Sequence, residues 1–380
     1  MKYKLSKNDS IWLSDTYKKI ETKIEAECHR IKNHIPYIAE NGKYEKDMSD
    51  SDQDIVWWTN GFWPGILWQM YHATKNEFYK TTAEEIEDKL DRALEVYTGL
   101  HHDVGFMWLH TSVANYRMTK NERSKARALH AAHLLAGRYN PRGKFIRSWN
   151  RDRAGWVIVD SMMNLPLLYW ARDEIGDPRF EYIAMDHADT VMNKTVRKDG
   201  SCNHIIALDP TNGNLLDTPA GQGYASGSSW SRGQAWAIYG FALSYKYTGK
   251  MEYLETSKKI ANYFLSEIEQ YDYLTVIDFR SPKSPQYWDS TAGVCAACGF
   301  LEISNHVEAD ERKFYIDLAL KILKAIDEKF CNWDPTFDSI VQMGSGSYFT
   351  EDDRHVPIIY GDYFFIEAIL RLMDKDILLW

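Results

Sequence analysis

Apolar residues recur three and four positions apart along most of the chain, and alternating apolar and polar segments are rare. This spacing places apolar side chains on one face of a helix. It predicts about twelve helices, near residues 11–35, 61–75, 83–98, 105–118, 122–138, 161–174, 178–195, 230–248, 251–269, 289–304, 311–328 and 361–373. We expect a β-hairpin within 196–215 and another within 270–280, where residues 273–277 are the best strand candidate.

Several helices are followed by a short polar turn and then by an aromatic residue that opens the next helix. This pattern occurs at residues 74–79, 176–182, 248–254 and 309–315. It is typical of the tight end of a helical hairpin. Such hairpins must bury their apolar faces against one another. Two arrangements fit, namely an open solenoid and a closed ring of six hairpins, the (α/α)6 toroid.

The segments between the hairpins are long and rich in Trp, Gly, His and Asp. They cover residues 139–160, 196–229, 270–290 and 330–360. A simple solenoid has short loops at both ends of its hairpins, whereas here only one end is tight. The asymmetry predicts an all-α (α/α)6 toroid with long decorated loops on one rim, which carries a site. Because no Pro/Ser linker interrupts the chain, we expect a single domain over residues 1–380.

The composition narrows the choice of partner and compartment. A net charge of −9 argues against general attraction to nucleic acid or to an anionic membrane. The chain starts without an apolar signal core, and no segment approaches a membrane span. Five scattered cysteines suit reduced thiols, so we expect a cytoplasmic protein. Cys295 and Cys298 have metal-type spacing but no second pair or His nearby, so we interpret them as packing residues.

Two carboxylates lie in unusual settings. Asp160 has apolar residues on both sides and no basic residue within six positions. Burial there would raise its pKa and make it a candidate general acid. Asp103 follows His101 and His102. Metal ligation by this group is one interpretation, but adjacent histidines point in different directions and no third ligand is obvious, so we favour hydrogen bonding.

A purely structural interpretation of the two carboxylates is also open. Asp160 would cap a helix that begins at Ser161, and Asp103 would cap one that begins near Gly105. The rim segments argue against this interpretation, because polar and aromatic residues are concentrated there. The whole chain contains 14 Trp, 24 Tyr and 15 Phe. These rings could fill a core, but they could also stack on sugar rings.

Residues 229–236 form the most distinctive of these rim clusters. Ser228 or Ser229 is expected to cap the helix at its start, where Trp230 and Arg232 lie close to free backbone N–H groups. An Arg in that position is a good ligand for a carboxylate. Together the clusters describe a cleft with an acid, a second carboxylate, stacking rings and a cation, as a uronic acid would need.

Several long segments resemble the unsaturated glucuronyl hydrolases, glycoside hydrolase family 88. They are residues 100–106, 157–168, 229–240 and 361–363. The similarity extends from Trp57 to about Leu372. It implies an (α/α)6 barrel, a cytoplasmic location, and no metal or organic cofactor. The implied substrates are oligosaccharides left by polysaccharide lyases, whose non-reducing uronic acid carries a C4=C5 double bond.

The resemblance also implies residue roles. Asp160 would protonate C4 and then take a proton from the water that attacks C5, after which the hemiketal opens and releases the next sugar. Asp103 would stay ionised and steady the developing positive charge. The residues that match the family's pocket are Trp58, His102, Trp149, His204, Gln222, Trp230, Arg232 and Trp236.

Two departures from the family pattern concern substrate choice. Asn60 stands where a relative has Asp. Members that prefer sulfated glycosaminoglycan fragments carry a Ser-x-x-Ser-x-Lys stretch, whereas residues 342–353 here contain no Lys. If Glu351, Asp352 and Asp353 face the cleft, they repel sulfate. The alternatives are an unsaturated rhamnogalacturonyl hydrolase acting on pectin fragments (family 105), an inverting glycosidase on the same barrel, and a non-catalytic helical scaffold that binds sugar or peptide.

Overall fold

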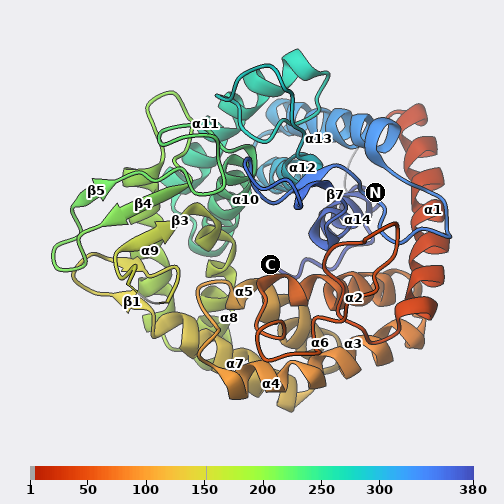
Figure 1. Ribbon diagram of the computed structural model, residues 1–380, viewed down its shortest axis with the longest axis horizontal. Helices are drawn as coiled ribbons and strands as arrows, with labels where there is room; N and C mark the ends of the chain where they lie inside the picture. Colours follow the sequence, from red (N-terminus) through yellow and green to blue (C-terminus); the bar gives the residue numbers. More distant parts are fainter. Residues whose placement is uncertain (1–4, 151) are drawn as a thin grey trace.

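The computed structural model describes residues 5–150 and 152–380, which form a closed ring of helices (Figure 1). Neighbouring inner elements contact one another all the way round, and the last of them contacts the first. The inner elements are α2 (Phe62–Thr74), the run α5–η2–α6 (Val104–Trp108, Leu109–Val113 and Ala114–Thr119), α8 (Leu165–Ile175), α10 (Ser231–Thr248), α12 (Ser290–Ser304) and α14 (Ile359–Leu372). The predicted (α/α)6 toroid is confirmed.

Each inner element packs against an outer helix. The outer helices are α1 (Lys7–Ile31), α3 (Glu77–Lys89), which α4 (Asp91–Val96) follows, α7 (Glu122–Ala136), α9 (Arg179–Thr195), α11 (Met251–Ile268) and α13 (Ala309–Phe330). Five pairs are consecutive hairpins, while the sixth joins α14 to α1. The two ends of the chain therefore close the ring.

The tight turns between helices confirm the predicted hairpin ends. The residues that end α8 and α10 are Gly176 and Gly249, with φ of 67° and 68°. Glycine adopts this left-handed conformation at little steric cost, so the chain can reverse within a few residues. All four predicted turns separate an inner helix from the outer helix that follows it.

Some predicted boundaries were wrong. The helix expected over 83–98 is two helices, which meet at Leu90. The helix expected from 161 begins as a 3-10 helix, η3 (Val159–Met163), before α8. The expected strand at 273–277 contributes only an isolated bridge between Val276 and Trp288. There the chain is held by Asp278, whose carboxylate accepts backbone N–H bonds from other segments, so no ladder continues.

The strands are short and lie in the long segments between hairpins. The hairpin predicted in 196–215 is confirmed as β4 (Ile205–Leu208) and β5 (Leu215–Asp217), and β3 (Trp156–Ile158) pairs with the other edge of β4. Two further pairs are β1 (Tyr139–Asn140) with β2 (Phe145–Ile146), and β6 (Gly344–Ser345) with β7 (Arg354–Val356). The 3-10 helices η1 (Trp58–Gly61) and η4 (Glu269–Tyr271) complete the described elements.

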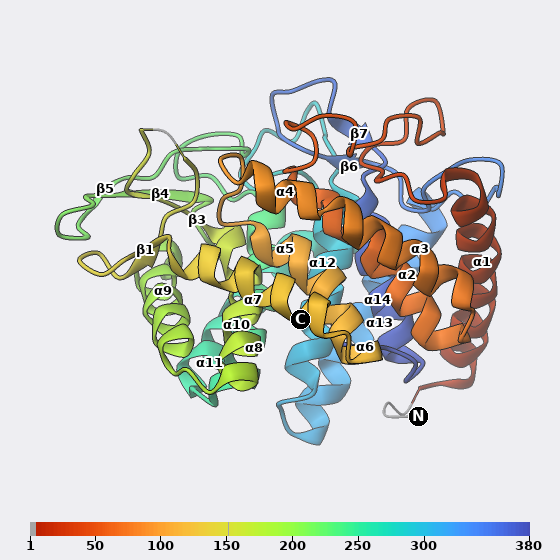
Figure 2. The same ribbon diagram turned by 90° about the horizontal axis from the view of Figure 1, so that it is seen from below.

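The ring has one decorated rim and one plugged end. Figure 2 shows β6, β7 and the segment after α1 at the upper rim, and the α12–α13 turn at the lower one. Trp380 fills the middle of the ring, where its ring stacks on Phe364 at 5.8 Å and its Nε1 donates to Glu367 at 2.8 Å. Within the described ranges, no helix combines the length and apolar character that a membrane crossing requires.

Candidate active site

Strand pairing brings Asp160 and His204 together at the decorated rim. β3 and β4 are antiparallel, and the Val159 N–H donates to the His204 carbonyl at 3.0 Å. As a result, Nε2 of His204 lies 3.9 Å from Oδ1 of Asp160. Asp160 lies inside η3, where no side chain makes a capping bond. The helix-cap interpretation of Asp160 is therefore wrong.

Asn164 connects the two carboxylates. Its Nδ2 donates to Oδ1 of Asp103 and to the backbone carbonyl of Asp160, both at 3.3 Å. Its Oδ1 accepts from the Phe106 N–H at 2.9 Å, which ties it to the start of α5. A Cβ on Gly105 would lie 2.6 Å from this amide, so the position needs glycine. The Asp103 side chain makes no capping bond to α5 either.

Burial perturbs Asp160 in the direction predicted from its apolar flanks. Its side chain is only 14 % exposed. Burial raises the pKa of Asp160 to about 7, while the nearby Arg232 guanidinium acts in the opposite direction. A carboxyl with this pKa is partly protonated at neutral pH, as general acid catalysis requires.

Asp103 differs from our expectation that it is ionised. Burial raises its pKa well above the ordinary range, and the Asp160 carboxylate raises it further. Two carboxyl groups in one poorly solvated site disfavour a double negative charge. The pair therefore holds at least one proton near neutral pH in the free protein.

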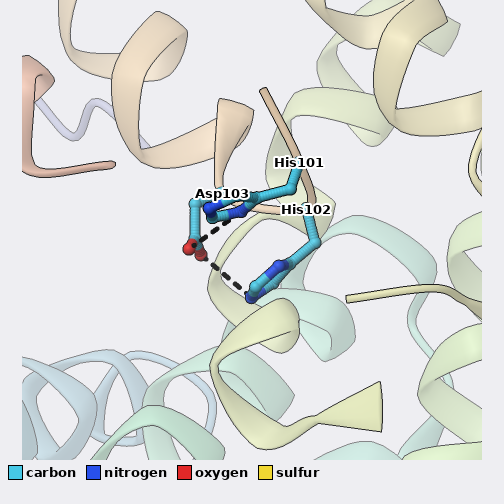
Figure 3. A group of neighbouring side chains, drawn as sticks. All are labelled: His101, His102 and Asp103. Carbon is cyan, nitrogen blue, oxygen red and sulfur yellow. Dashed lines mark ion pairs between the residues drawn. The ribbon is translucent and has the colours of Figure 1, made fainter. Parts of the chain in front are cut away.

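The two histidines before Asp103 face it together (Figure 3). Their rings stack with centroids 5.0 Å apart, so the expectation that they point in different directions was wrong. Nδ1 of His101 lies 3.4 Å from Oδ2 of Asp103, and Nε2 of His102 lies 3.2 Å from Oδ1. Burial lowers the pKa of both histidines, that of His101 to about 4, so both rings are neutral.

His102 has a defined hydrogen-bonding direction. Its Nδ1 lies 2.8 Å from the Ser148 carbonyl, which can only accept, so Nδ1 carries the hydrogen. In the neutral ring Nε2 is then an acceptor toward Asp103. The ligand atoms of His101, His102 and Asp103 lie within 4.8 Å of one another, a spacing that could also hold a metal ion. Within the described residues, neither His101 Nδ1 nor His102 Nε2 makes a hydrogen bond, so the expected hydrogen bonds to Asp103 are not formed and these atoms face the carboxyl group with open hydrogen-bonding capacity.

Arg232, predicted as a carboxylate ligand, binds a carboxylate of the protein itself. It is 1 % exposed, and its Nη1 forms an ion pair with Asp289 at 2.6 Å. It also donates to the backbone carbonyls of Ser345 and Gly346, and its guanidinium stacks over Trp230 at 4.5 Å. Arg232 therefore joins α10 to α12 and to β6.

The predicted serine cap of α10 was wrong. The residue before the helix is Trp230, which has no side-chain cap, and Oγ of Ser228 donates to Asp278 at 2.6 Å instead. Trp230 packs against His204, with ring centroids 4.1 Å apart and the ring planes tilted by 36°. Gln222 extends this side of the site, because its Nε2 donates to the Gly346 carbonyl at 2.7 Å and its backbone N–H donates to Nδ1 of His204.

The remaining predicted tryptophans lie around the same centre at different depths. Trp149 is half-buried and meets the edge of His102 at 5.7 Å. Trp58 is half-buried and lies 5.2 Å from Phe106. Trp236 is fully buried and packs on the same Phe106 at 5.3 Å, below the surface layer. All ten predicted residues thus join one connected cluster, in which Trp236 is a floor residue.

The cluster contains a concentration of unsatisfied polar atoms. Buried polar groups are nearly always hydrogen-bonded, so an accumulation of exceptions indicates a place for a polar ligand. The buried atoms without a hydrogen-bond partner among the described residues include Asp160 Oδ1, His101 Nδ1, His102 Nε2, His204 Nε2, Trp230 Nε1 and Trp236 Nε1.

Sequence reasoning missed the residues that hold this cluster in place. Asn164 was visible as a lone amide in an apolar segment. Asp289 could be recognised from the sequence only as a helix cap, and it does accept a hydrogen bond from the Thr291 N–H at 3.2 Å. Its pairing with Arg232 could not be predicted from the neighbouring residues. Asp362, in the 361–363 segment, is structural, since it accepts from the N–H groups of Ile340 and Val341.

Comparison with known proteins points to one family. The family model described as Glycosyl Hydrolase Family 88 matches residues 27–273. An unsaturated glucuronyl hydrolase of Bacillus sp. (strain GL1) is 37 % identical, with 83 % of this chain and 86 % of the relative covered. An unsaturated chondroitin disaccharide hydrolase of Streptococcus pyogenes serotype M1 is 31 % identical, with 86 % and 84 % covered.

Solved structures show the same relationship. The crystal structure of the unsaturated glucuronyl hydrolase from Streptococcus agalactiae superposes with a TM-score of 0.90 at 28 % identity, covering 99 % of this chain and 94 % of the other. The family model covers well over half of the chain, and the relatives align along most of their length. This chain belongs to glycoside hydrolase family 88.

Proposed function

We propose that this protein removes the 4,5-unsaturated uronic acid from the non-reducing end of lyase-generated oligosaccharides by hydrating the C4=C5 bond. The observation that carries the proposal is the poorly solvated Asp160, with a pKa of about 7, joined to Asp103 through Asn164. Relatives named for unsaturated glucuronyl and chondroitin disaccharide hydrolysis support the same chemistry.

Asp160 acts first as an acid and then as a base. It donates its proton to C4, and the π electrons of the double bond form the new C4–H bond. The positive charge left at C5 is shared with the ring oxygen. A water molecule attacks C5 and gives its proton to the ionised Asp160, which restores the acid. The hemiketal opens to a C5 ketone, and the hemiacetal formed at C1 then collapses and releases the next sugar.

Asp103 changes charge during this cycle. Burial and the nearby Asp160 raise the pKa of Asp103, which favours its protonated form in the free protein, and a neutral carboxyl gives no electrostatic help to a cation. Nε2 of His102 lies 3.2 Å away and can accept the proton, because Nδ1 already donates to Ser148. As positive charge develops at C5, the ionised form of Asp103 becomes favourable. His102 is thus the proton store for Asp103 in this proposal.

The other residues bind and orient the sugar. Trp58 and Trp149 are half-buried and offer ring faces or edges, whereas Trp236 supports the floor. Nε2 of His204 and Nε1 of Trp230 offer donors that no described residue uses. Arg232 supplies positive potential for the uronate. Most of its donors are already bound to Asp289 and to the backbone of β6, so it acts more by charge than as a bidentate clamp.

The loop around β6 and β7 favours substrates without sulfate. Glu351 and Asp352 are exposed, and the half-buried Asp353 packs against Gly346, which itself accepts from Arg232. No lysine of this loop faces the site, because residues 342–353 contain none. We therefore propose unsulfated glycosaminoglycan-type disaccharides as the preferred class, with pectin-derived fragments as the alternative.

A panel of unsaturated disaccharides tests the function. Chondroitin, hyaluronan, heparin and pectin disaccharides, sulfated and unsulfated, are followed by loss of the double-bond absorbance. We expect turnover of unsulfated glycosaminoglycan members and none of their saturated counterparts. Cleavage of saturated substrates would indicate an ordinary glycosidase, and absence of turnover on every member would reject the proposal.

A further inference from the structure

A cavity lies beside the catalytic cluster, between the end of α7, the β1–β2 hairpin and the segment before α5. Its volume is about 760 Å³. Part of its lining comes from the end of α7, which is an outer helix of the ring (Figure 1). We call it the Arg138 cavity after its most buried cation. His101 lines it and, on its other side, contacts Asp103.

The lining of the Arg138 cavity is strongly cationic. Arg138, Arg142 and Arg147 line it, and its lining includes no Asp or Glu. This local excess of positive charge contrasts with the net charge of −9 of the whole chain. A cation cluster maintained in an acidic protein favours an anionic ligand at that place.

Arg138 lacks a counterion within the described ranges. Its guanidinium donates to the carbonyls of Arg147 and Ser148 and to the Asn150 amide, which are all neutral acceptors. Burial and the neighbouring Arg147 lower the pKa of Arg138 to about 10. A half-buried cation without a counterion is unfavourable, and an anion in the cavity would relieve that cost.

Arg142 supplies a second, more accessible donor. Its side chain is exposed and takes part in no ion pair with a described residue. It also borders a neighbouring hollow that contains Asp186 and Asp189, but those carboxylates pair with Lys144 and Lys250. Arg142 can therefore turn toward an anion in the Arg138 cavity.

The walls suit an organic ligand as well as a bare ion. Pro141, Pro210 and Tyr97 line the cavity, and Tyr97 is 56 % exposed. Flat apolar faces beside guanidinium groups are the combination that binds acidic sugars, since rings stack while arginine grips the oxyanion. We infer that the Arg138 cavity is an oxyanion-binding site, which takes inorganic sulfate or phosphate or the acidic group of a saccharide.

Calorimetric titration of the full chain with sodium sulfate tests the inference, with sodium chloride at equal ionic strength as the reference. The Asp160→Asn variant is used so that no turnover occurs. We expect saturable binding of one sulfate. Arg142→Gln should weaken it about tenfold, as the loss of one charge-assisted hydrogen bond predicts. Because Arg142 is exposed, this variant should fold normally.

Two further variants sharpen the result. Arg138→Lys keeps the charge but removes the planar fork, and should weaken sulfate binding by a similar factor. Arg179→Gln, an exposed arginine of α9, is the matched control and should have no effect. Non-saturable binding, or equal affinity in the parent and in both cavity variants, would overturn the site.

The source of the oxyanion is resolved by comparing ligands. A saturated, sulfated oligosaccharide is titrated into the Asp160→Asn protein. Binding at least about tenfold tighter than that of inorganic sulfate identifies a saccharide ligand, provided that adding Arg142→Gln removes the difference. Equal affinities identify a free anion, and both results support the site. Arg142→Gln should leave turnover unchanged in sulfate-free buffer, so failure of this site is distinguishable from failure of the proposed activity.

Discussion

Replacing Asp160 by Asn should stabilise the fold while it removes activity. Asn has nearly the same shape but no charge to bury. The pKa of Asp160 rises from an ordinary 3.8 to about 7 on folding. One pH unit of pKa corresponds to about 1.4 kcal/mol, so the ionised form is disfavoured in the folded protein by about 4 kcal/mol. The 14 % exposure of the side chain makes this an upper limit.

The effect has a defined pH window. Below about pH 4 Asp160 is protonated in both folded and unfolded chains, so the parent and the variant should be equally stable. Between about pH 4 and 7 the unfolded chain releases this proton and the folded chain keeps it, so the stability of the parent falls as pH rises. Above pH 7 the full difference is reached, and the variant is more stable.

Thermal unfolding from pH 4.5 to 8.5 measures this difference. With an unfolding entropy of about 2.1 cal/mol/K per residue, 4 kcal/mol corresponds to a Tm increase of about 5 °C for a chain of this length. Asp50→Asn, at an exposed carboxylate, is the matched control and should show no pH-dependent difference. A Tm difference that is constant across the range, or that favours the parent at pH 8, would refute the assignment of a buried, proton-retaining Asp160.

Four other outcomes follow from the same geometry. Gly105→Ala should reduce kcat at least about tenfold by displacing Asn164. Gly137→Ala, where a Cβ meets only two backbone carbonyls, at 3.3 and 3.5 Å, should not reduce it, and equal effects of the two substitutions would show that Asn164 does not position the carboxyl groups. Asp289→Asn should lower stability by about 3 kcal/mol because it leaves Arg232 buried without its partner, as measured by denaturant unfolding. Activity should fall about tenfold per pH unit above pH 7, and a flat profile to pH 9 would exclude Asp160 as the acid. Asp353→Lys should raise kcat/KM on sulfated disaccharides relative to unsulfated ones, and an unchanged ratio would show that this loop does not select them.

Most of the fold could be predicted from the helical spacing of the apolar residues. Apolar spacing and turn residues are local signals, so the hairpins and the toroid could be predicted. The pairing of α1 with α14 could not, because it joins the two ends of the chain and no local pattern specifies it. The break of the predicted helix 83–98 at Leu90 was missed for a similar reason, since tertiary packing overrides a continuous helical pattern.

The site was predictable where the chemistry was local. The flanks of Asp160 are apolar in sequence, and its raised pKa follows from them. The pKa of Asp103 is raised by burial and by Asp160, 57 positions later, and Arg232 forms its ion pair with Asp289, also 57 positions later. These long-range pairs could not be predicted, because no local sequence pattern specifies which distant side chains meet.

Loss of the double-bond absorbance of an unsaturated, unsulfated disaccharide, compared between the parent and Asp160→Asn, tests the central claim most directly. We expect steady turnover in the parent and a loss of at least about a thousandfold in the variant, with substrate still bound, because Asp160 is the proposed proton donor to C4. Near-normal turnover by Asp160→Asn would contradict the account.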